Sequence, residues 1–321
     1  MSKIKIFTCL LLATLVLAQP VSAKAATELS GKMVFHNYSS YDAEDSKLYV
    51  YDFSLMKLKC ISKNWKEVKN PMNARLRKDG KAIVFMGQTR QGEWDIFEYT
   101  FSKSKPVNLT KGNGLDDEDP KYNVKGNKIV FKQSNPSGKG SRIVQYDCKS
   151  KKQTVLIKGS TEKSMPFYSN DGKKVYYVEG TGKNMTLMVG NTTGNKKKTG
   201  TVLYKKAGVQ SYYPIASKDG KYLYFSRGYN SKNRADQIIR YDLKTGKTTS
   251  LKCNSKGYDC SDACPISSDY IIISSSKSGG KGGYDLYLVN IQTGKMTNLN
   301  KYQKKINTSL EELGCDYLEI K

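Results

Sequence analysis

The residues that could carry chemistry fall first into an acidic run, formed by the consecutive residues Asp116, Asp117, Glu118 and Asp119. Clustered carboxylates in an irregular loop could hold Ca²⁺, which takes about six to eight oxygen ligands. The spacing of the four residues does not match an EF-hand loop. A Ca²⁺ site and an ordinary solvated turn are therefore both open readings of this run.

A second group of residues is basic and aromatic. Guanidinium groups and aromatic rings suit the stacking of sugar rings, pairing with acidic substituents, or contact with a protein partner. Exposed charge and packing between strands are the alternative. The predicted ligand-binding residues are Trp65, Arg90, Trp94, Arg142, Tyr212, Tyr213, Arg227, Tyr229, Arg234 and Lys281.

Catalytic chemistry has little basis in the residue types. The chain has one histidine, His36, which could act as a lone base but cannot build a metal cluster by itself. It has no G-x-S-x-G segment, so a nucleophilic serine of the hydrolase type is not indicated. We therefore name no catalytic residue, and the residue types favour a protein without catalytic activity while leaving an enzyme as the open alternative.

The elements that must position these residues are short β-strands joined by tight turns. Residues 211–251 give the clearest unit, with turns at Asp219-Gly220 and Thr245-Gly246 between runs rich in Tyr, Ile, Leu and Phe. Similar units follow Pro71, Pro120, Pro166, Pro214 and Pro265, which are 46 to 51 residues apart. The second-strand runs are 78–86, 125–132, 170–178, 218–226 and 267–275, and the third-strand runs are 95–101, 141–148, 185–191, 237–243 and 284–291.

This repeat predicts an all-β propeller in one domain, residues 24–321, most simply with six four-stranded blades. The earliest copy, 31–61, lacks a first strand, and residues 306–320 contain strand-like segments that could supply it. Pairing of the N- and C-terminal strands would then close the ring and remove an unpaired sheet edge. A seventh blade is the alternative.

The segments Lys218-Asp219-Gly220-Lys221 and 241–247 (YDLKTGK) resemble the repeat of TolB-like β-propellers. The resemblance covers nearly the whole chain after the first residues, and it implies the propeller alone, without the α/β domain that precedes it in TolB. It also implies a second candidate function, because some oligouronide lyases are built on this fold. Their site uses several histidines around a metal, and only His36 is present here.

The strand order predicts which face of the propeller could carry a site. The short Asp-Gly and Thr-Gly turns join strands one to two and three to four, so they share one face. The long, variable loops and the links between blades share the other face, and loops of this kind often carry function. We therefore place the candidate site on the loop-rich face, over the central channel.

Residues 1–23 have the pattern of a signal peptide, with Lys3 and Lys5, an apolar run over 6–18, and the small residues 21–23. The run is shorter than the roughly 20 residues of a membrane span, and no later stretch is apolar enough. We expect a secreted protein, whether extracellular, periplasmic or associated with the cell envelope. The remaining six cysteines permit disulfides, and Cys253, Cys260 and Cys264 are close enough in sequence for a local bridge.

The chain is strongly basic, with a formal net charge of +25, which falls to +23 without Lys3 and Lys5. Only seven basic residues are Arg, so bidentate phosphate recognition is not favoured and no specific nucleic acid is expected. Weak attraction to polyanions or simple solubility would both explain the lysines. We predict an exported, monomeric binding module for a protein or an acidic polysaccharide, with a polysaccharide lyase as the alternative.

Overall fold

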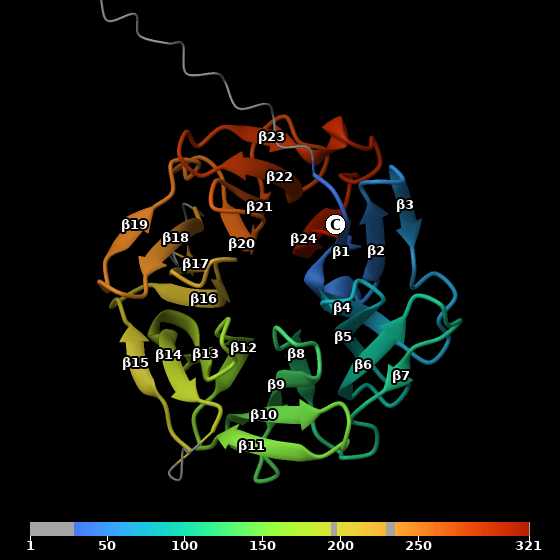
Figure 1. Ribbon diagram of the computed structural model, residues 1–321, viewed down its shortest axis with the longest axis vertical. Helices are drawn as coiled ribbons and strands as arrows, with labels where there is room; N and C mark the ends of the chain where they lie inside the picture. Colours follow the sequence, from blue (N-terminus) through green and yellow to red (C-terminus); the bar gives the residue numbers. More distant parts are fainter. Residues whose placement is uncertain (1–28, 194–197, 229–234, 321) are drawn as a thin grey trace, which may run out of the picture.

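The computed structural model describes residues 29–193, 198–228 and 235–320. Six four-stranded antiparallel sheets stand around a central channel, as Figure 1 shows. The predicted six-bladed propeller is thereby confirmed, and there is no seventh sheet in the described part of the chain. The predicted signal peptide lies outside the described residues.

Each blade is a meander in which the innermost strand lines the channel. The blade that contains both ends of the ring consists of β24 (Glu311–Leu318), β1 (Lys32–Tyr38), β2 (Lys47–Asp52) and β3 (Lys57–Cys60). The next consists of β4 (Lys69–Leu76), β5 (Ala82–Gln88), β6 (Trp94–Thr100) and β7 (Val107–Asn108). The third consists of β8 (Asp117–Tyr122), β9 (Lys128–Ser134), β10 (Ser141–Asp147) and β11 (Gln153–Ile157).

The other three blades follow in chain order. They are β12 (Lys163–Tyr168), β13 (Lys174–Glu179), β14 (Thr186–Asn191) and β15 (Thr201–Tyr204); β16 (Gln210–Ala216), β17 (Tyr222–Gly228), β18 (Gln237–Asp242) and β19 (Thr248–Ser250); and β20 (Cys260–Pro265), β21 (Tyr270–Ser275), β22 (Asp285–Asn290) and β23 (Met296–Asn298). Single 3₁₀ turns occur at η1 (Tyr41–Ala43), η2 (Gly182–Asn184) and η3 (Leu299–Lys301). None of the helices in this part of the chain has the length and apolar character needed to cross a membrane.

Closure of the ring depends on β24, as predicted from the truncated first copy. This strand runs antiparallel to β1, with Lys32 opposite Leu318 and Tyr38 opposite Glu311. The Tyr317 hydroxyl adds a hydrogen bond of 2.5 Å to the carbonyl oxygen of Ser30. The last strand therefore gives β1 the inner neighbour that its own copy of the repeat lacks.

The Ser-x-Asp-Gly-Lys turn explains the uniformity of the opposite, short-turn face. The Asp219 carboxylate accepts hydrogen bonds from the Ser217 hydroxyl at 2.6 Å and from the Lys221 amide at 3.1 Å. Gly220 adopts a φ of 70°, which an L side chain rarely adopts. The same arrangement recurs around Asp171, so the motif folds this turn by local hydrogen bonds in different blades.

Every inner strand carries a β-bulge at the same height in the channel, where the pairing register slips by one residue. The bulged residues at this height have positive φ and are Asn73, Asp119, Met165, Tyr213, Asp262 and Gly314. Strand β4 has a second register slip three residues earlier, at Asn70, which also has positive φ. The residues after the bulges at the common height are therefore the true equivalents of Pro120. By this measure the sequence anchors at Pro71 and Pro265 are wrong, because Ala74 and Ala263 occupy those positions.

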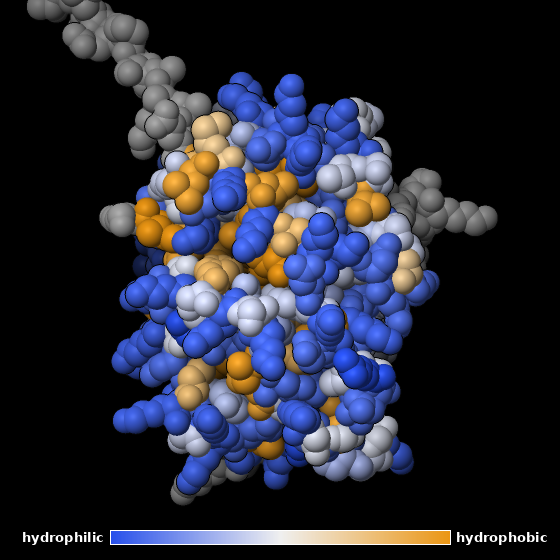
Figure 2. Space-filling view, turned by 90° about the vertical axis from the view of Figure 1, so that its right-hand side faces the viewer, coloured by the Kyte–Doolittle hydropathy of each residue, from blue (hydrophilic) through white to orange (hydrophobic). Residues whose placement is uncertain are grey.

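The hydrophobic core lies between blades rather than at the centre of the ring. One cluster joins Val34 and Leu48 to Ile83 and Phe85 of the next blade, and each of the other inter-blade layers is built in the same way. The side of the molecule in Figure 2 is mostly hydrophilic, with hydrophobic residues in separate small groups. The six described cysteines are free thiols, and hydrogen bonds pair Cys253 with Cys260 and Cys264 with Cys315.

Replacing Gly314 by alanine should destabilise the protein more than replacing a glycine in an open turn. A Cβ at Gly314 would lie 2.5 Å from Cε1 of His36, whereas at Gly172 nothing lies within 4 Å. Both glycines have positive φ, 61° and 69°, so Gly172→Ala isolates the backbone penalty of about 1–2 kcal/mol. Urea denaturation should show a larger loss for Gly314→Ala, and equal losses would contradict the close packing on His36.

Candidate functional site

The candidate site is a cavity of about 540 Å³ at the loop-rich mouth of the channel. Residues from all six blades line it, because the inner strands converge there and the long loops form its rim. Below it the channel narrows to a waist of about 10 Å³, bordered by Asn73, Arg75, Lys121, Tyr213 and Asp262. The waist separates this mouth from a second cavity on the short-turn face.

Carboxylates dominate the charged groups of this loop-rich mouth. The lining acidic residues are Glu118, Asp119, Glu162, Asp236, Asp262 and Glu311. Among the described lining residues there is one ammonium group, that of Lys132, and it forms ion pairs of 3.1 Å with Glu118 and 2.8 Å with Glu162. Among the described residues that line the mouth, carboxylates therefore outnumber basic groups, although the chain as a whole has a formal charge of +25.

His36 does not offset this negative charge. Burial and the nearby Arg75 guanidinium lower the pKa of its imidazole to about 3, so the ring is neutral at physiological pH. Its Nδ1 accepts a hydrogen bond of 3.4 Å from the backbone N–H of Asn73. A buried, neutral imidazole whose Nδ1 is occupied is a poor general base, and its packing on Gly314 gives it a structural role.

The bulges aim two of the carboxylates at the channel. Asp119 and Asp262 are bulged residues of β8 and β20, and a third bulged residue, Asn73, donates a hydrogen bond of 2.8 Å to the Asp119 carboxylate. The Gly314 amide lies 3.4 Å from the Asp262 carboxylate. Loss of hydration raises the pKa of Asp262 to about 6, so its charge changes in a mildly acidic range.

Tyrosine and methionine side chains form the rest of the cavity wall. The residues are Tyr38, Tyr41, Tyr212, Tyr213 and Tyr284 together with Met72, Met86, Met165 and Met185. The Tyr212 and Tyr213 rings meet edge to face at 5.7 Å, and the Tyr212 hydroxyl donates to the Asp236 carboxylate. Polarisable rings and thioethers beside carboxylates favour a cationic group with an apolar stem.

The four residues of the acidic run do not converge on one point, because the β-bulge at Asp119 breaks the alternation that would put its side chain on the same face as that of Asp117. The Asp117 carboxylate is buried and accepts hydrogen bonds from Asn113 and Gln133 at 2.7 and 2.8 Å. Asp116 is exposed and accepts one from the Trp94 amide at 3.1 Å, while Glu118 and Asp119 line the cavity. Across the described ranges, no three His, Cys, Asp or Glu side chains are grouped to hold a metal ion.

Of the predicted ligand-binding residues, the structure brings Tyr212 and Tyr213 into the cavity. Trp65 is instead buried between two blades, where its ring stacks on Phe85 at 5.1 Å, so it cannot stack on a ligand. Trp94 is half-buried at the edge of the β6 strand beside another inter-blade cluster. An aromatic residue in a linker is therefore not a reliable sign of exposure in this fold.

The predicted basic residues are dispersed around the rim. The Arg142 and Arg227 side chains donate to Gln133 and Gln237 at 2.9 and 3.1 Å, within their own blades. Arg90 lines a separate cavity at the edge of one blade, and Lys281 is exposed on the β21–β22 loop. Tyr229 and Arg234 lie outside the described residues.

Sequence reasoning missed most of the carboxylates of the mouth, since Glu162, Asp236, Asp262 and Glu311 are far apart in the chain. The available signal was positional. In Asp119-Pro120 and Tyr213-Pro214 the residue before the repeat's proline is the bulged residue that faces the channel. Reading that position in each copy would have found Asp262, had the last anchor not been placed on Pro265.

Comparison with known proteins supports the fold. Neither a protein-family model nor the sequence of a curated protein matches this chain. In structure the chain is similar to TolB from Acinetobacter baumannii, with a TM-score of 0.71, 14% identity, and coverage of 92% of this chain and 68% of that one. This likeness confirms the predicted TolB-like propeller fold.

Two other solved structures show how widely this fold is shared. An oligogalacturonate lyase from Vibrio parahaemolyticus matches with a TM-score of 0.56 and 11% identity over 81% of this chain and 72% of that one. A chain of a nidogen/laminin complex matches with a TM-score of 0.63 and 9% identity over 89% of this chain and 98% of that one. At such identities the similarity establishes the fold and leaves function to the site.

The raised pKa of Asp262 predicts how stability depends on pH. Because the folded state binds a proton at Asp262 that the unfolded chain releases near pH 4, the contribution of this residue to the free energy of unfolding should fall as pH rises from about 4 to about 6. Asp262→Asn removes this term, so the variant should be more stable than the wild type at pH 8, by on the order of 1–2 kcal/mol, and nearly equal to it at pH 4.

Asp171→Asn is the matched control for this pH dependence. Hydrogen bonds from the Ser169 hydroxyl and the Lys173 amide lower the pKa of Asp171, so its carboxylate stabilises the fold above the unfolded pKa. That contribution is lost as pH falls through the folded pKa, and the variant should be less stable than the wild type at pH 8. Denaturation curves at both pH values test the opposite signs, and a loss at pH 8 in Asp262→Asn would contradict the prediction.

Proposed function

We propose that this protein is an exported binding module whose loop-rich mouth receives a cationic segment of a protein partner. The observation that carries the proposal is the excess of carboxylates over ammonium groups among the described residues around the 540 Å³ cavity, with Asp119 and Asp262 at its centre. This local charge is opposite in sign to the net charge, so it does not follow from overall composition. A lysine or arginine side chain would gain Coulomb attraction there and contact the tyrosine rings along its stem.

The same charge argues against an acidic polysaccharide as the ligand of this mouth. A uronate carboxylate would approach Glu118, Asp119 and Asp262 and be repelled by them. The nidogen/laminin structure supports the choice of a protein partner, since it is a complex between two proteins in which one chain has this fold. Of the two predicted ligands, a protein and an acidic polysaccharide, we therefore retain the protein.

A lyase is the less supported reading of the same cavity. The oligogalacturonate lyases share the fold, and one is recorded in complex with manganese. The resemblance to these lyases implies several histidines around a metal. This chain has one histidine, His36, and its imidazole is buried, neutral and packed on Gly314. The carboxylates are also dispersed around the mouth instead of being gathered at one point.

Binding of a pentalysine peptide with blocked ends tests the proposed function. The wild type should bind it with an affinity that falls as salt rises, and should not bind the matching pentaglutamate peptide. The double variant Asp119→Asn/Asp262→Asn should weaken binding by about thirtyfold, because each carboxylate contributes on the order of 1 kcal/mol of attraction. Calorimetric titration measures both affinities.

Glu67→Gln is the control, because it removes an exposed carboxylate that does not line the mouth. Equal weakening by Glu67→Gln and by the double variant would reduce the effect to net charge and overturn the proposed site. Release of unsaturated products from oligogalacturonate, followed by ultraviolet absorbance, would instead support the lyase.

The oxidation state of the cysteines tests the proposed export. In an oxidising compartment the adjacent pairs Cys253–Cys260 and Cys264–Cys315 should form disulfides, and the second would join β20 to the closing strand β24. Protein recovered from the culture medium or cell envelope should begin after Ala23, and reduction should lower its melting temperature. A full-length chain with all thiols free in that fraction would contradict export by this route.

A further inference from the structure

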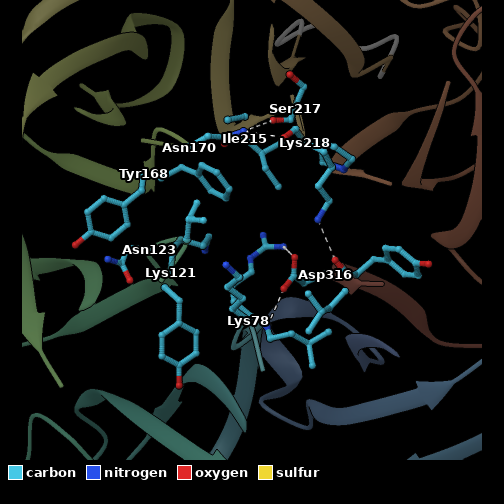
Figure 3. Close-up of a pocket in the computed structure, with 18 residues that line it drawn as sticks. Lys78, Lys121, Asn123, Tyr168, Asn170, Ile215, Ser217, Lys218 and Asp316 are labelled. Carbon is cyan, nitrogen blue, oxygen red and sulfur yellow. Dashed lines mark hydrogen bonds and ion pairs between the residues drawn. The ribbon is translucent and has the colours of Figure 1, made fainter. Parts of the chain in front are cut away.

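The channel has a second mouth, on the short-turn face, with the opposite charge. Its cavity of about 360 Å³ is lined by Arg75, Lys78, Lys121 and Lys218 and by one carboxylate, that of Asp316. Figure 3 shows Lys78, Lys121 and Lys218 around this cavity, and they come from three different blades. The short turns of this face are uniform, and the proposed function uses only the opposite mouth.

The one carboxylate of this mouth is already occupied. Asp316 accepts a hydrogen bond of 2.7 Å from the Leu76 amide and lies 3.7 Å from the Arg75 guanidinium. Arg75 also donates through Nη1 to the Cys315 carbonyl oxygen at 2.6 Å, and Lys218 donates to the Tyr317 carbonyl oxygen at 3.1 Å. These bonds fix the side chains without neutralising the excess of positive charge.

Lys121 is the decisive residue of the cavity. Its side chain is 4% exposed and lines both the short-turn mouth and the waist, yet its Nζ has no hydrogen-bond partner. The Arg75 Nε is buried and unpartnered in the same way. Buried donors normally find an acceptor, so two orphaned cationic donors at the floor of one cavity indicate a missing anion.

The rest of the lining indicates what kind of anion would fit. Apolar side chains, including Leu76, Phe167, Ile215 and Leu318, form much of the wall around the charged floor. The side-chain amide of Asn170, which also lines the cavity, is already bonded to the carbonyl oxygens of Ser217 and Lys218 at 3.0 Å each. A bare inorganic ion would leave the apolar wall uncovered, whereas an apolar group carrying one acid would cover it.

We propose that the short-turn mouth binds a monocarboxylate with an apolar or aromatic body, with the carboxylate on Lys121 and Arg75 and the body against the apolar wall. Such a group could be a free organic acid or the C-terminal residue of a peptide. Access from the loop-rich side is blocked by the narrow waist and by the negative charge of the other mouth. This site is independent of the proposed function, and either one can fail alone.

The proposal is tested with N-acetylphenylalanine, its amide, phenylacetate and inorganic phosphate in calorimetric titrations. N-acetylphenylalanine should bind, whereas its amide and phosphate should bind at least tenfold more weakly. Phenylacetate separates the two sources of the ligand, because its binding equally well would favour a free acid and its failure would favour a peptide C-terminus. Equal binding of N-acetylphenylalanine and its amide would overturn the proposal.

Lys121→Met keeps the length of the side chain and removes the charge, and it should weaken N-acetylphenylalanine binding at least tenfold. Lys125→Met, an exposed lysine outside the cavity, should change it less than twofold. If Lys121→Met does not fold, Lys218→Met at the rim should still weaken binding several-fold. Unchanged binding in Lys121→Met or in Lys218→Met would refute the site.

Proton uptake on binding separates the two roles of Lys121, because a lysine that only supports the fold would not change its protonation when the acid binds. The Lys121 amine faces Arg75, Asp119, Asp262 and Asp316, and burial is the largest cause that lowers its pKa to about 7. A bound carboxylate would raise that pKa, so binding at pH 8 should take up a proton in the wild type and in Lys125→Met. Absence of uptake in the wild type would contradict contact between the acid and this amine.

Discussion

Antiparallel pairing of β1 with β24 is the constraint on which the rest of this structure depends. A propeller blade buries its faces against its two neighbours, so the core exists only when the ring is complete. Here the chain begins its first blade at the second strand and supplies the innermost strand about 270 residues later. Contacts between the first and last blades therefore rest on a pairing between the two ends of the chain.

Ring closure also sets the shape of the channel. Because six inner strands are held around one axis, their bulges fall at one height and form the narrow waist between two mouths. The bulged residues differ in type from blade to blade while the backbone conformation is the same. The scaffold thus repeats its geometry and varies its chemistry, which is how propellers with one architecture come to host unrelated functions.

The two mouths differ in charge because the bulged residue and the residue two positions after it face different ends of the channel. Asp119 and Asp262 serve the loop-rich mouth, while Arg75 and Lys121, two residues beyond their bulges, serve the short-turn mouth. Separation of opposite charges along a narrow channel gives each end its own ligand preference. The unpartnered donors of Arg75 and Lys121 lie two residues after a bulge, and Asp119 and Asp262 are themselves bulged residues.

The sequence by itself determined the all-β class, the six blades, the positions of nearly all second and third strands, and closure by the C-terminus. The strands and turns are local properties, since Asp-Gly turns fold by hydrogen bonds within a few residues, as around Asp219. Closure is a long-range pairing, but the first copy of the repeat lacks one strand and the C-terminal segment is the one left to supply it. Only the tertiary structure decided three features. Trp65 is buried in the core between two blades, the Asp117 side chain is buried while that of Asp119 lines the cavity, and the described lining of the loop-rich mouth is acidic. Those outcomes depend on which residues from six separate blades meet at the axis, and closure of the ring alone brings them together.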